Sequence, residues 1–326
     1  MSTILVTGAT GFTGGHLART LRRRGHHVRA LVRDPARAAK LAAEGIELVR
    51  GDVTDPGSVA RAVDGCEFVY HIAALYREAR HPDDVYWRVN VDGTANVLDA
   101  AERAGVQRVI HCSTVGVHGD VKRMPADEKA PYAPGDIYQK TKLAGERIAQ
   151  ERFANGLPGT VVRPAGIYGP GDMRFLKLFR AIKNRTFLMI GDGETHYHLT
   201  YIDDLVEGMI LCAESPQAIG QTYILAGPRH TTLNELVAAT ARAVGCRPPR
   251  GRIPVFPVMA AARLAERICR PLGIEPPLHE RRVSFFIKNR GFCIDKARHE
   301  LGYVPRVELE EGIQRTAQWY RANGLL

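Results

Sequence analysis

Residues 7–14 read TGATGFTG and constrain the fold more than any other stretch of the chain. The three glycines follow the branched apolar run TILVT at 3–7 and precede a helical pattern that ends at Gly25. Glycines placed in this way allow a tight turn and let a pyrophosphate approach the backbone at the positive N-terminus of the helix. We therefore predict a dinucleotide-binding loop. Its expected binding residues are Gly8, Thr10, Gly11, Phe12, Thr13 and Gly14.

The strand–helix pattern of the loop continues through the first half of the chain. Short apolar runs rich in branched residues, typical of buried parallel strands, recur between helical patterns. They lie at 3–7, 28–32, 46–49, 67–72, 108–112 and 160–163. This alternation predicts an α/β fold with a doubly wound parallel sheet of the Rossmann type and right-handed crossovers.

Beyond about residue 170 the alternation stops, and proline-rich stretches separate the helical patterns. We expect a dinucleotide-binding domain at 1–170 and a smaller, mixed α/β substrate-binding domain at 171–326. The segment 198–228 is expected to return to the first domain.

The end of the second strand bears on the choice between NAD and NADP. An acid there would hold the ribose 2′-hydroxyl of NAD, but the run reads ALVRD, with Val32 at the expected position and Arg33 after it. A guanidinium matches a 2′-phosphate, which a carboxylate would repel. We therefore favour NADP, while Asp34 keeps NAD open. Asp52, after the third strand, is expected to accept a hydrogen bond from the adenine amino group.

Composition narrows the choice of partners. The chain has 326 residues, 45% of them hydrophobic, and a formal net charge of +10 that is spread without a basic, aromatic stripe. We therefore expect a small-molecule substrate and no nucleic-acid partner. The six scattered cysteines show no metal-ligand spacing, so no metal is expected, and free thiols suit a reducing compartment. The start shows no leader pattern and no apolar run is long enough to cross a membrane, so we expect a cytoplasmic protein without a membrane span.

The stretch DIYQKTKLAGE at 136–146 places a tyrosine and a lysine four residues apart at the start of a helical pattern. Positions i and i+4 share one helix face, so Tyr138 and Lys142 are expected to point the same way. A free tyrosine has a pKa of about 10, and a fixed cation nearby favours the phenolate that a general base requires. The alternative is an ordinary amphipathic helix with a packed tyrosine and a solvated lysine.

Several motifs in a fixed order give the chain a family likeness. The motifs are TGATGFTG, GDV (51–53), HIAA (71–74), NVDGT (90–94), CSTVGVHG (112–119), YQKTK (138–142), RPAGIYGPGD (163–172) and YIDD (201–204). Together they resemble the extended short-chain dehydrogenases/reductases, a family that includes NAD-dependent epimerases/dehydratases and 3β-hydroxysteroid dehydrogenase-like enzymes. The resemblance covers nearly the whole chain. It adds Val53 and Ala73 to the expected cofactor site and suggests a homodimer.

The resemblance also implies a catalytic triad of Thr114, Tyr138 and Lys142. Tyr138 exchanges a proton with the substrate oxygen, Thr114 hydrogen-bonds the same oxygen, and Lys142 lowers the pKa of Tyr138 and binds the nicotinamide ribose. Ser113 is the fallback for the hydroxyl position. The implied activity is NAD(P)-dependent hydride transfer at a secondary alcohol or ketone.

Two departures from the nucleotide-sugar enzymes of this family bear on the substrate. Those enzymes commonly carry Asn where this chain has Gly166, and Arg where it has Tyr197, beside His196 and His198. We therefore expect a 3β-hydroxysteroid dehydrogenase-like enzyme or a related carbonyl reductase, with substrate contacts from Ser113, Gly166, Tyr197 and His198. A nucleotide-sugar epimerase/dehydratase, in which His196, His198, Arg290 or Lys288 replaces the missing groups, and a non-catalytic dinucleotide-sensing protein are the alternatives.

Overall fold

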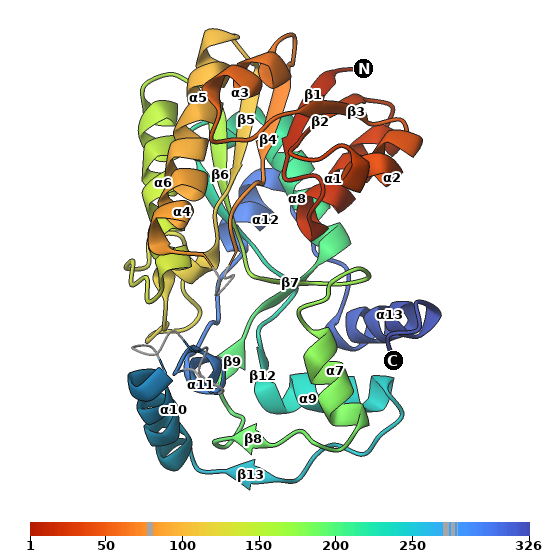
Figure 1. The fold of residues 1–326 in the computed structure, drawn as a ribbon, viewed down its shortest axis with the longest axis vertical. Coiled ribbons are helices and arrows are strands. Elements are labelled where there is room, and N and C mark those ends of the chain that lie inside the picture. The colour runs from red at the N-terminus through yellow and green to blue at the C-terminus, as the bar shows by residue number, and fades with distance from the viewer. Residues whose placement is uncertain (77–80, 270–273, 275–277, 279) are drawn as a thin grey trace.

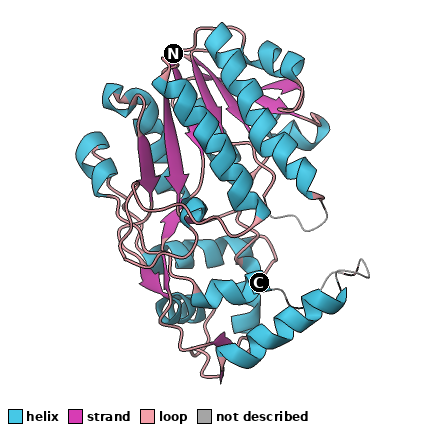
Figure 2. Cartoon of the chain, turned by 90° about the vertical axis from the view of Figure 1, so that its left-hand side faces the viewer, coloured by secondary structure: helices cyan, strands magenta, loops and turns pink. Residues whose placement is uncertain are grey.

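The structure is a computed structural model that describes residues 1–76, 81–269, 274, 278 and 280–326. Its first part is a parallel sheet of seven strands between two layers of helices (Figures 1 and 2). The strand order is β11-β6-β5-β4-β1-β2-β3, and every neighbouring pair is parallel. The strands are β1 (Thr3–Thr7), β2 (His27–Val32), β3 (Glu47–Arg50), β4 (Phe68–His71), β5 (Arg108–Cys112), β6 (Gly159–Pro164) and β11 (Thr222–Leu225).

Alternating side chains of the strands build two hydrophobic cores, one on each face of the sheet. In β1, Ile4 and Val6 belong to one core, which continues into the second part of the chain, and Leu5 belongs to the other. The larger core contains apolar side chains of α1 (Phe12–Arg23), α2 (Ala39–Ala43), α8 (Ile202–Glu214) and α12 (Asp295–Leu301). The smaller core lies under α3 (Pro56–Val63), α5 (Gly93–Arg103) and α6 (Ile137–Ala154). Before α5 the chain forms α4 (Asp83–Trp87) and one π-helical turn (Arg88–Asp92).

Two later segments of the chain return to this sheet. The segment 198–228 supplies α8 and the edge strand β11, which pairs with β6. Helix α12 packs on β11, where Tyr223 Oη donates to Glu300 Oε2 at 2.6 Å. No repeat or periodicity pointed to the return of α12, because its contacts with β11 join residues about 75 positions apart in the chain.

The remaining elements form the lower part of the molecule in Figure 1. Short strands pair there as β7 (Gly166–Tyr168) with β10 (Leu199–Tyr201), β8 (Met189–Ile190) with β13 (Arg252–Ile253), and β9 (His196–Tyr197) with β12 (Thr231–Thr232). The helices are α7 (Leu176–Lys183), α9 (Leu233–Ala243), α10 (Val255–Cys269), α11 (Glu280–Ile287) and α13 (Leu309–Ala322). Short 3-10 turns occupy Ala36–Ala38, Val115–His118 and Pro216–Ala218. Among the described residues, no helix combines the length and hydropathy required to span a membrane.

Candidate active site

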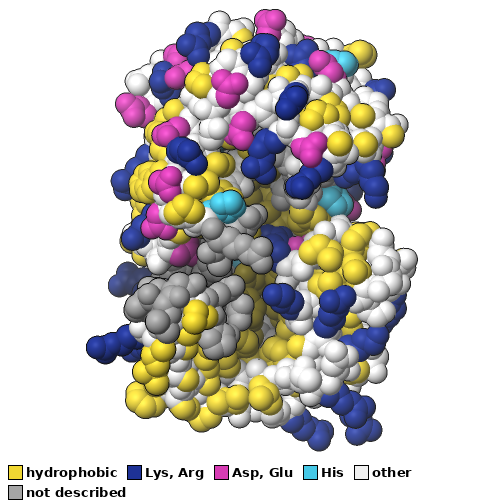
Figure 3. Space-filling view, in the orientation of Figure 1, with side chains coloured by type: hydrophobic (Ala, Val, Ile, Leu, Met, Phe, Trp, Pro, Cys, Tyr) yellow, Lys and Arg dark blue, Asp and Glu magenta, His cyan; other side chains and the backbone are white. Residues whose placement is uncertain are grey.

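A cleft of about 1630 Å³ lies between the sheet and the lower part of the molecule, where Figure 3 shows the surface hollowed. Its upper wall is formed by the carboxyl ends of β1, β2, β4 and β5 and by the first turns of α1 and α6. Ligands of open parallel sheets bind at this edge, because the loops that follow the strands converge there. The lower wall comes from residues after β6, from α7 and from α11.

The glycine loop between β1 and α1 is closed by short backbone contacts. Gly11 N donates to Gly8 O at 3.0 Å, and Gly8 has a φ of +73°, a conformation that favours glycine. A Cβ on Gly14 would lie 2.3 Å from Gly8 O, and one on Gly8 would lie 2.8 Å from Ala73 N. The loop therefore stays narrow and directs the N-terminus of α1 at the cleft, which fits a pyrophosphate. All six predicted loop residues and Ala73 line the cleft.

The part of the cleft beyond the glycine loop is bounded by the ends of β2 and β3. Arg33 is exposed and lines the cleft, whereas Asp34 caps the following turn: its Oδ1 accepts from Ala36 N at 3.0 Å, and its Oδ2 lies 3.4 Å from Arg37 Nε. Asp52 Oδ1 accepts from the backbone N and hydroxyl of Thr54, both at 2.9 Å. Val53 also lines the cleft. Asp34 does not line the cleft, so Arg33 is the charged group that β2 presents to the cofactor side.

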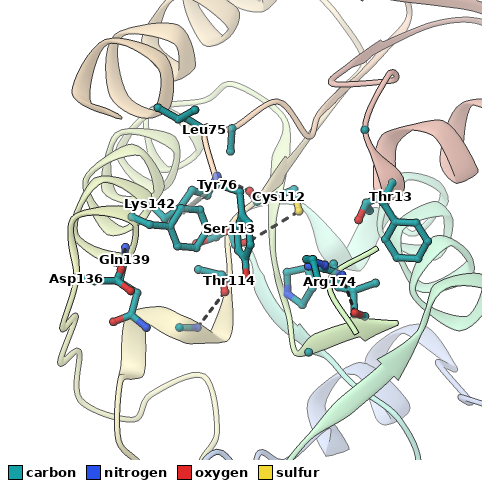
Figure 4. A pocket seen from close by; sticks show the side chains of 18 of the residues that line it. Thr13, Leu75, Tyr76, Cys112, Ser113, Thr114, Asp136, Gln139, Lys142 and Arg174 are labelled. Atoms are coloured by element: carbon teal, nitrogen blue, oxygen red, sulfur yellow. Dashed lines mark hydrogen bonds between the residues drawn. The ribbon is translucent and has the colours of Figure 1, made fainter. Parts of the chain in front are cut away.

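Tyr138 and Lys142 both line the cleft from the first turns of α6. Asp136 starts this helix by accepting from Gln139 N at 2.8 Å, as Figure 4 shows. Lys142 is only 2% exposed, and its Nζ donates to Cys112 O, at the end of β5, at 2.6 Å. Burial lowers the pKa of the Lys142 ammonium, and Cys112 and Glu146 oppose this shift. The Tyr138 ring meets the Tyr76 ring edge-on, with 4.9 Å between their centroids.

A buried hydrogen-bond chain ties β1 and β4 to Thr94 in the first turn of α5, whose Oγ1 donates to Asn90 O at 2.8 Å in the π-helical turn before it. Thr7 Oγ1 accepts from the backbone N of Ile72 and Ala73, both at 3.1 Å, so its proton points to His71 Nδ1 at 2.9 Å. His71 Nε2 therefore donates to Thr94 Oγ1 at 3.1 Å. Burial and the nearby Lys142 cation lower the pKa of His71 to about 3, which keeps the ring neutral.

Asn90 extends this chain to α6. Its Oδ1 accepts from Leu75 N at 2.7 Å, and its Nδ2 donates to Thr141 Oγ1 at 3.0 Å. Thr141 lies between Tyr138 and Lys142 on α6. Asn90 therefore fixes the distance between α6 and the loop that follows β4. Asn90 entered our prediction only as the first residue of the motif NVDGT and had no predicted place in the site, because the spacing within the motif does not show which groups it contacts.

The two hydroxyls after β5 have different surroundings. The Ser113 hydroxyl is buried and donates to Glu146 Oε2. Glu146 also forms a buried ion pair with Arg163, whose side chain is 1% exposed. Thr114 is half-buried at the cleft, where its Oγ1 accepts from Gly116 N at 3.0 Å (Figure 4). Thr114 can therefore donate its hydroxyl proton to a ligand, whereas Ser113 donates its proton to Glu146.

We expect Thr114→Val to lower kcat by about 100-fold, the loss typical of removing one hydrogen-bond donor from a transition state. The matched change Ser113→Ala is expected to leave kcat within about threefold and to lower the free energy of unfolding by about 1–3 kcal/mol, because it removes a buried partner of Glu146. Steady-state kinetics and urea unfolding of both variants measure these effects. A larger loss of kcat in Ser113→Ala would assign the hydroxyl role to Ser113.

Three of the four predicted substrate residues, Gly166, Tyr197 and His198, meet at the lower wall of the cleft, whereas Ser113 lines it from the end of β5. A Cβ on Gly166 would lie 2.7 Å from Tyr197 Cε1, so the Tyr197 ring occupies the space that a side chain at 166 requires. The His198 ring also lines the cleft, but both its nitrogens are bonded: Nε2 to Gly227 O at 3.0 Å and Nδ1 to Phe292 N at 3.3 Å. Burial lowers the pKa of His198 to about 4. His196 instead pairs with His230, with 2.9 Å between their Nδ1 atoms, and does not line the cleft.

Aromatic and cationic side chains that our prediction did not include complete the lower wall. Phe175, Phe187, Phe285 and Phe286 supply apolar surface, and Lys177 and Arg174 add positive charge. Arg174 donates to Asp172 Oδ1 at 2.7 Å and lies over the rings of Phe12 and Tyr76, 5.7 and 5.6 Å from their centroids. Lys288 and Arg290, which we named from the sequence as possible replacements for the missing groups, also line the cleft, and Lys288 lies next to Gly135, just before α6. Their positions depend on contacts between distant segments, which no local pattern reveals.

Known proteins resemble this chain in architecture and in sequence. The model of the NAD dependent epimerase/dehydratase family matches residues 4–226. A 3β-hydroxysteroid dehydrogenase/Δ5→4-isomerase of Mycobacterium tuberculosis is 33% identical over 97% of this chain and 90% of its own. A 4-hydroxy-2-methyl-3-oxo-4-farnesyl-3,4-dihydroquinoline-1-oxide ketoreductase of Stigmatella aurantiaca is 33% identical over 96% and 95%. The crystal structure of gox2253 superposes with a TM-score of 0.85 at 31% identity over 100% of both chains. The chain belongs to the NAD-dependent epimerase/dehydratase family, among the extended short-chain dehydrogenases/reductases.

Proposed function

We propose that this protein is an NAD(P)-dependent oxidoreductase that interconverts a secondary alcohol and a ketone on a largely apolar substrate. A bound nicotinamide supplies or accepts the hydride. Tyr138 exchanges the proton of the reacting oxygen, and Thr114 hydrogen-bonds the same oxygen. Lys142 holds the nicotinamide ribose and favours the phenolate of Tyr138.

The observation that carries this proposal is the placement of Lys142. Its ammonium is buried and bonded to Cys112 O, directly before the segment that bears Thr114. Tyr138 lies one turn earlier on the same helix, and the glycine loop lines the same cleft. A buried ammonium costs stability unless a partner offsets its desolvation, and an ammonium held at such a cost often serves a function; here its carbonyl partner lies at the carboxyl edge of the sheet. The groups required for hydride and proton transfer are thus gathered at one edge.

The lower wall supports an apolar substrate. Tyr197 fills the space beside Gly166, and four phenylalanines add apolar surface between the cations of the same wall. A nucleotide sugar, in contrast, carries a diphosphate and depends on charge-assisted hydrogen bonds worth about 1.5–3 kcal/mol each. Both the dehydrogenase and the ketoreductase among the relatives are named for reactions at a hydroxyl or keto group. Their names support a sterol-like alcohol or a related ketone as the substrate class.

A panel of ligands tests this proposal. Thermal unfolding is measured with NADP present and with one further ligand at a time. The first group of ligands consists of 3β-hydroxysterols and long-chain β-keto compounds, and the second group consists of UDP and dTDP. A ligand at 100 times its dissociation constant adds about 2.7 kcal/mol of stability. We expect stabilisation by members of the apolar set and reduction or oxidation of the cofactor with them. Stabilisation by UDP or dTDP alone would contradict the proposal.

The second candidate function is a nucleotide-sugar epimerase or dehydratase that uses the same triad. Lys288 and Arg290 favour it, because both cations line the cleft. Arg290 lies over the Tyr197 ring, 5.5 Å from its centroid, at the place where the sequence lacks the expected arginine. The ligand panel separates the two functions. A non-catalytic dinucleotide sensor would bind the cofactor in the same panel but would turn over no substrate.

For the cofactor we propose NADP over NAD, because Arg33 is exposed at the cofactor side while Asp34 is engaged in a turn. Arg33→Ala is expected to weaken NADP binding about tenfold or more, the loss of one charge-assisted hydrogen bond, and to change NAD binding by less than about threefold. The matched control is Arg37→Ala, since Arg37 pairs with Asp34 and does not line the cleft. Isothermal titration measures both affinities. Equal losses for NADP and NAD would place the 2′-phosphate elsewhere.

We also propose the two-domain division, the homodimer and the cytoplasmic location expected from the sequence. The sheet with its helices and the lower part, which meet at the cleft, support the division at about residue 170. All six cysteines are free, which suits a reducing compartment. Light scattering of the purified chain tests the homodimer.

A further inference from the structure

Helix α10 presents an unusual outer face. Phe256, Leu264 and Ile268 are 83%, 59% and 54% exposed, and Ala260 between them is exposed as well. These residues recur at four-residue intervals and therefore form one stripe along the helix. Single exposed apolar residues are ordinary on a soluble protein, but a continuous stripe on one helix marks a contact surface. Hydrophobic side chains (yellow) gather over α10 at the lower left of Figure 3.

The exposed charged residues of α10 itself, Arg263 and Arg267, are both positive, and the chain before α10 adds further arginines. From Cys246 to Cys269 the chain has five arginines and a single acid, Glu266. The arginines are all exposed: Arg247, Arg250, Arg252, Arg263 and Arg267. Glu266 is buried on the opposite side of α10, where it lines the cleft and accepts from Glu280 N at 2.8 Å. Among the described residues, the half-buried Glu280 pairs with Arg263, with 3.3 Å between Glu280 Oε2 and Arg263 Nε.

We propose that the outer face of α10 docks on the surface of a membrane that contains anionic lipids. A helix with an apolar stripe and flanking arginines lies in the plane of the interface, with its apolar side chains among the acyl chains and its guanidinium groups at the lipid phosphates. Figures 1 and 2 show α10 at the outer edge of the lower part, where a flat surface can reach it. No spanning helix is required for this mode of binding.

The charge of α10 favours a membrane over a second copy of the chain as the partner of this face. A two-fold contact brings the same patch of both subunits together, so Arg263 and Arg267 of one copy would face those of the other. The exposed face of α10 carries no acid of its own, and the acid beside Arg263 is Glu280 of α11. A bilayer surface with anionic headgroups can neutralise Arg263 and Arg267, the two arginines of α10, at the same time.

Helix α10 lies next to the cleft, so docking through its outer face also positions the cleft relative to the membrane. Its inner face contributes Glu266 to the cleft wall, beside Phe285 and Phe286 of α11. Docking through the outer face therefore brings this wall close to the lipid. If the substrate is apolar, as the proposed function holds, docking holds the cleft close to the bilayer in which such a substrate dissolves.

Vesicle flotation with the full chain tests the docking surface. We expect binding to vesicles of phosphatidylcholine with phosphatidylglycerol at least tenfold tighter than to phosphatidylcholine alone. The double change Phe256→Glu and Leu264→Glu is expected to reduce binding at least tenfold. Arg267→Glu is expected to reduce binding at low salt, and added salt should shrink the difference in binding between this variant and the unchanged chain. Val304→Glu is the matched control, because Val304 is exposed and lies outside α10; it should bind like the unchanged chain. NADP affinity, measured on every variant, reports that the sheet domain is intact.

Three results would overturn the proposal. The first is no binding of the unchanged chain to anionic vesicles, and the second is binding that the double change leaves unaltered. The third is a dimer in light scattering that the double change dissociates, because the stripe is then a subunit interface. None of these results bears on hydride transfer, so the docking surface and the proposed reaction are tested separately.

Discussion

Replacing Tyr138 by phenylalanine is expected to abolish turnover while leaving cofactor binding nearly unchanged. The change removes one hydroxyl at the cleft and keeps the ring that packs edge-on against Tyr76. General acid–base catalysis by a positioned side chain contributes about 10²–10⁴-fold to a rate, so kcat should fall by about that factor. The affinity for NADP should change by less than about threefold, because the glycine loop and Lys142 are untouched. Steady-state kinetics and isothermal titration measure the two effects.

Tyr76→Phe is the matched control for Tyr138→Phe. Tyr76 lines the same cleft and keeps its ring contacts with Tyr138 and Arg174 when the hydroxyl is removed. Its kcat is expected to stay within about tenfold of the unchanged enzyme, below the range of general acid–base contributions. Substantial residual activity in Tyr138→Phe, or equal losses in both variants, would remove Tyr138 from the proposed mechanism.

Gly14→Ala is expected to give the largest loss of cofactor affinity. The new Cβ would lie 2.3 Å from Gly8 O and 2.7 Å from Gly8 C, so the loop has to open at the point where the backbone approaches the pyrophosphate. The atoms that must move are backbone atoms and cannot rotate away. We expect the affinity for NADP to fall more than about 100-fold, which corresponds to about 2.8 kcal/mol. Isothermal titration measures this loss.

Gly11→Ala is the graded comparison within the same loop. A Cβ on Gly11 would lie 3.2 Å from Gly8 O, which requires a shift of a few tenths of an ångström. Its φ of −85° suits an L-residue, so the loss should be about tenfold or less. If Gly14→Ala folds and binds NADP as tightly as Gly11→Ala, the narrow loop is not the pyrophosphate site.

The fold followed from local patterns. Short branched runs, helical periodicity and the glycine loop predicted the parallel sheet of the Rossmann type, and the structure has seven parallel strands in a doubly wound order. These signals are local because the strands are buried on both faces and therefore carry continuous apolar runs. The short strands of the lower part, such as β8 and β9 with two residues each, leave no such run.

The candidate site followed from the sequence only where one segment carries several groups. Tyr138 and Lys142 share one helix, so their common face was predictable from spacing. Other features of the site join residues that lie 30 or more positions apart or on separate elements. They are the bond from Lys142 to Cys112, the contact of Tyr197 with Gly166, and the hydrogen-bond chain from Thr7 through His71 to Asn90. Such contacts depend on how the elements pack, which spacing alone does not determine.

The most direct test of the central claim is a crystal structure of the protein with NADP bound. The claim is that hydride is exchanged beside the Tyr138 hydroxyl, on a nicotinamide whose ribose is held by Lys142. The predicted result is a nicotinamide ring next to Tyr138 Oη, with a ribose hydroxyl about 3 Å from Lys142 Nζ and the pyrophosphate on the glycine loop. A nicotinamide ring that lies away from Tyr138, with Lys142 bonded to Cys112 O and not to the ribose, would contradict it.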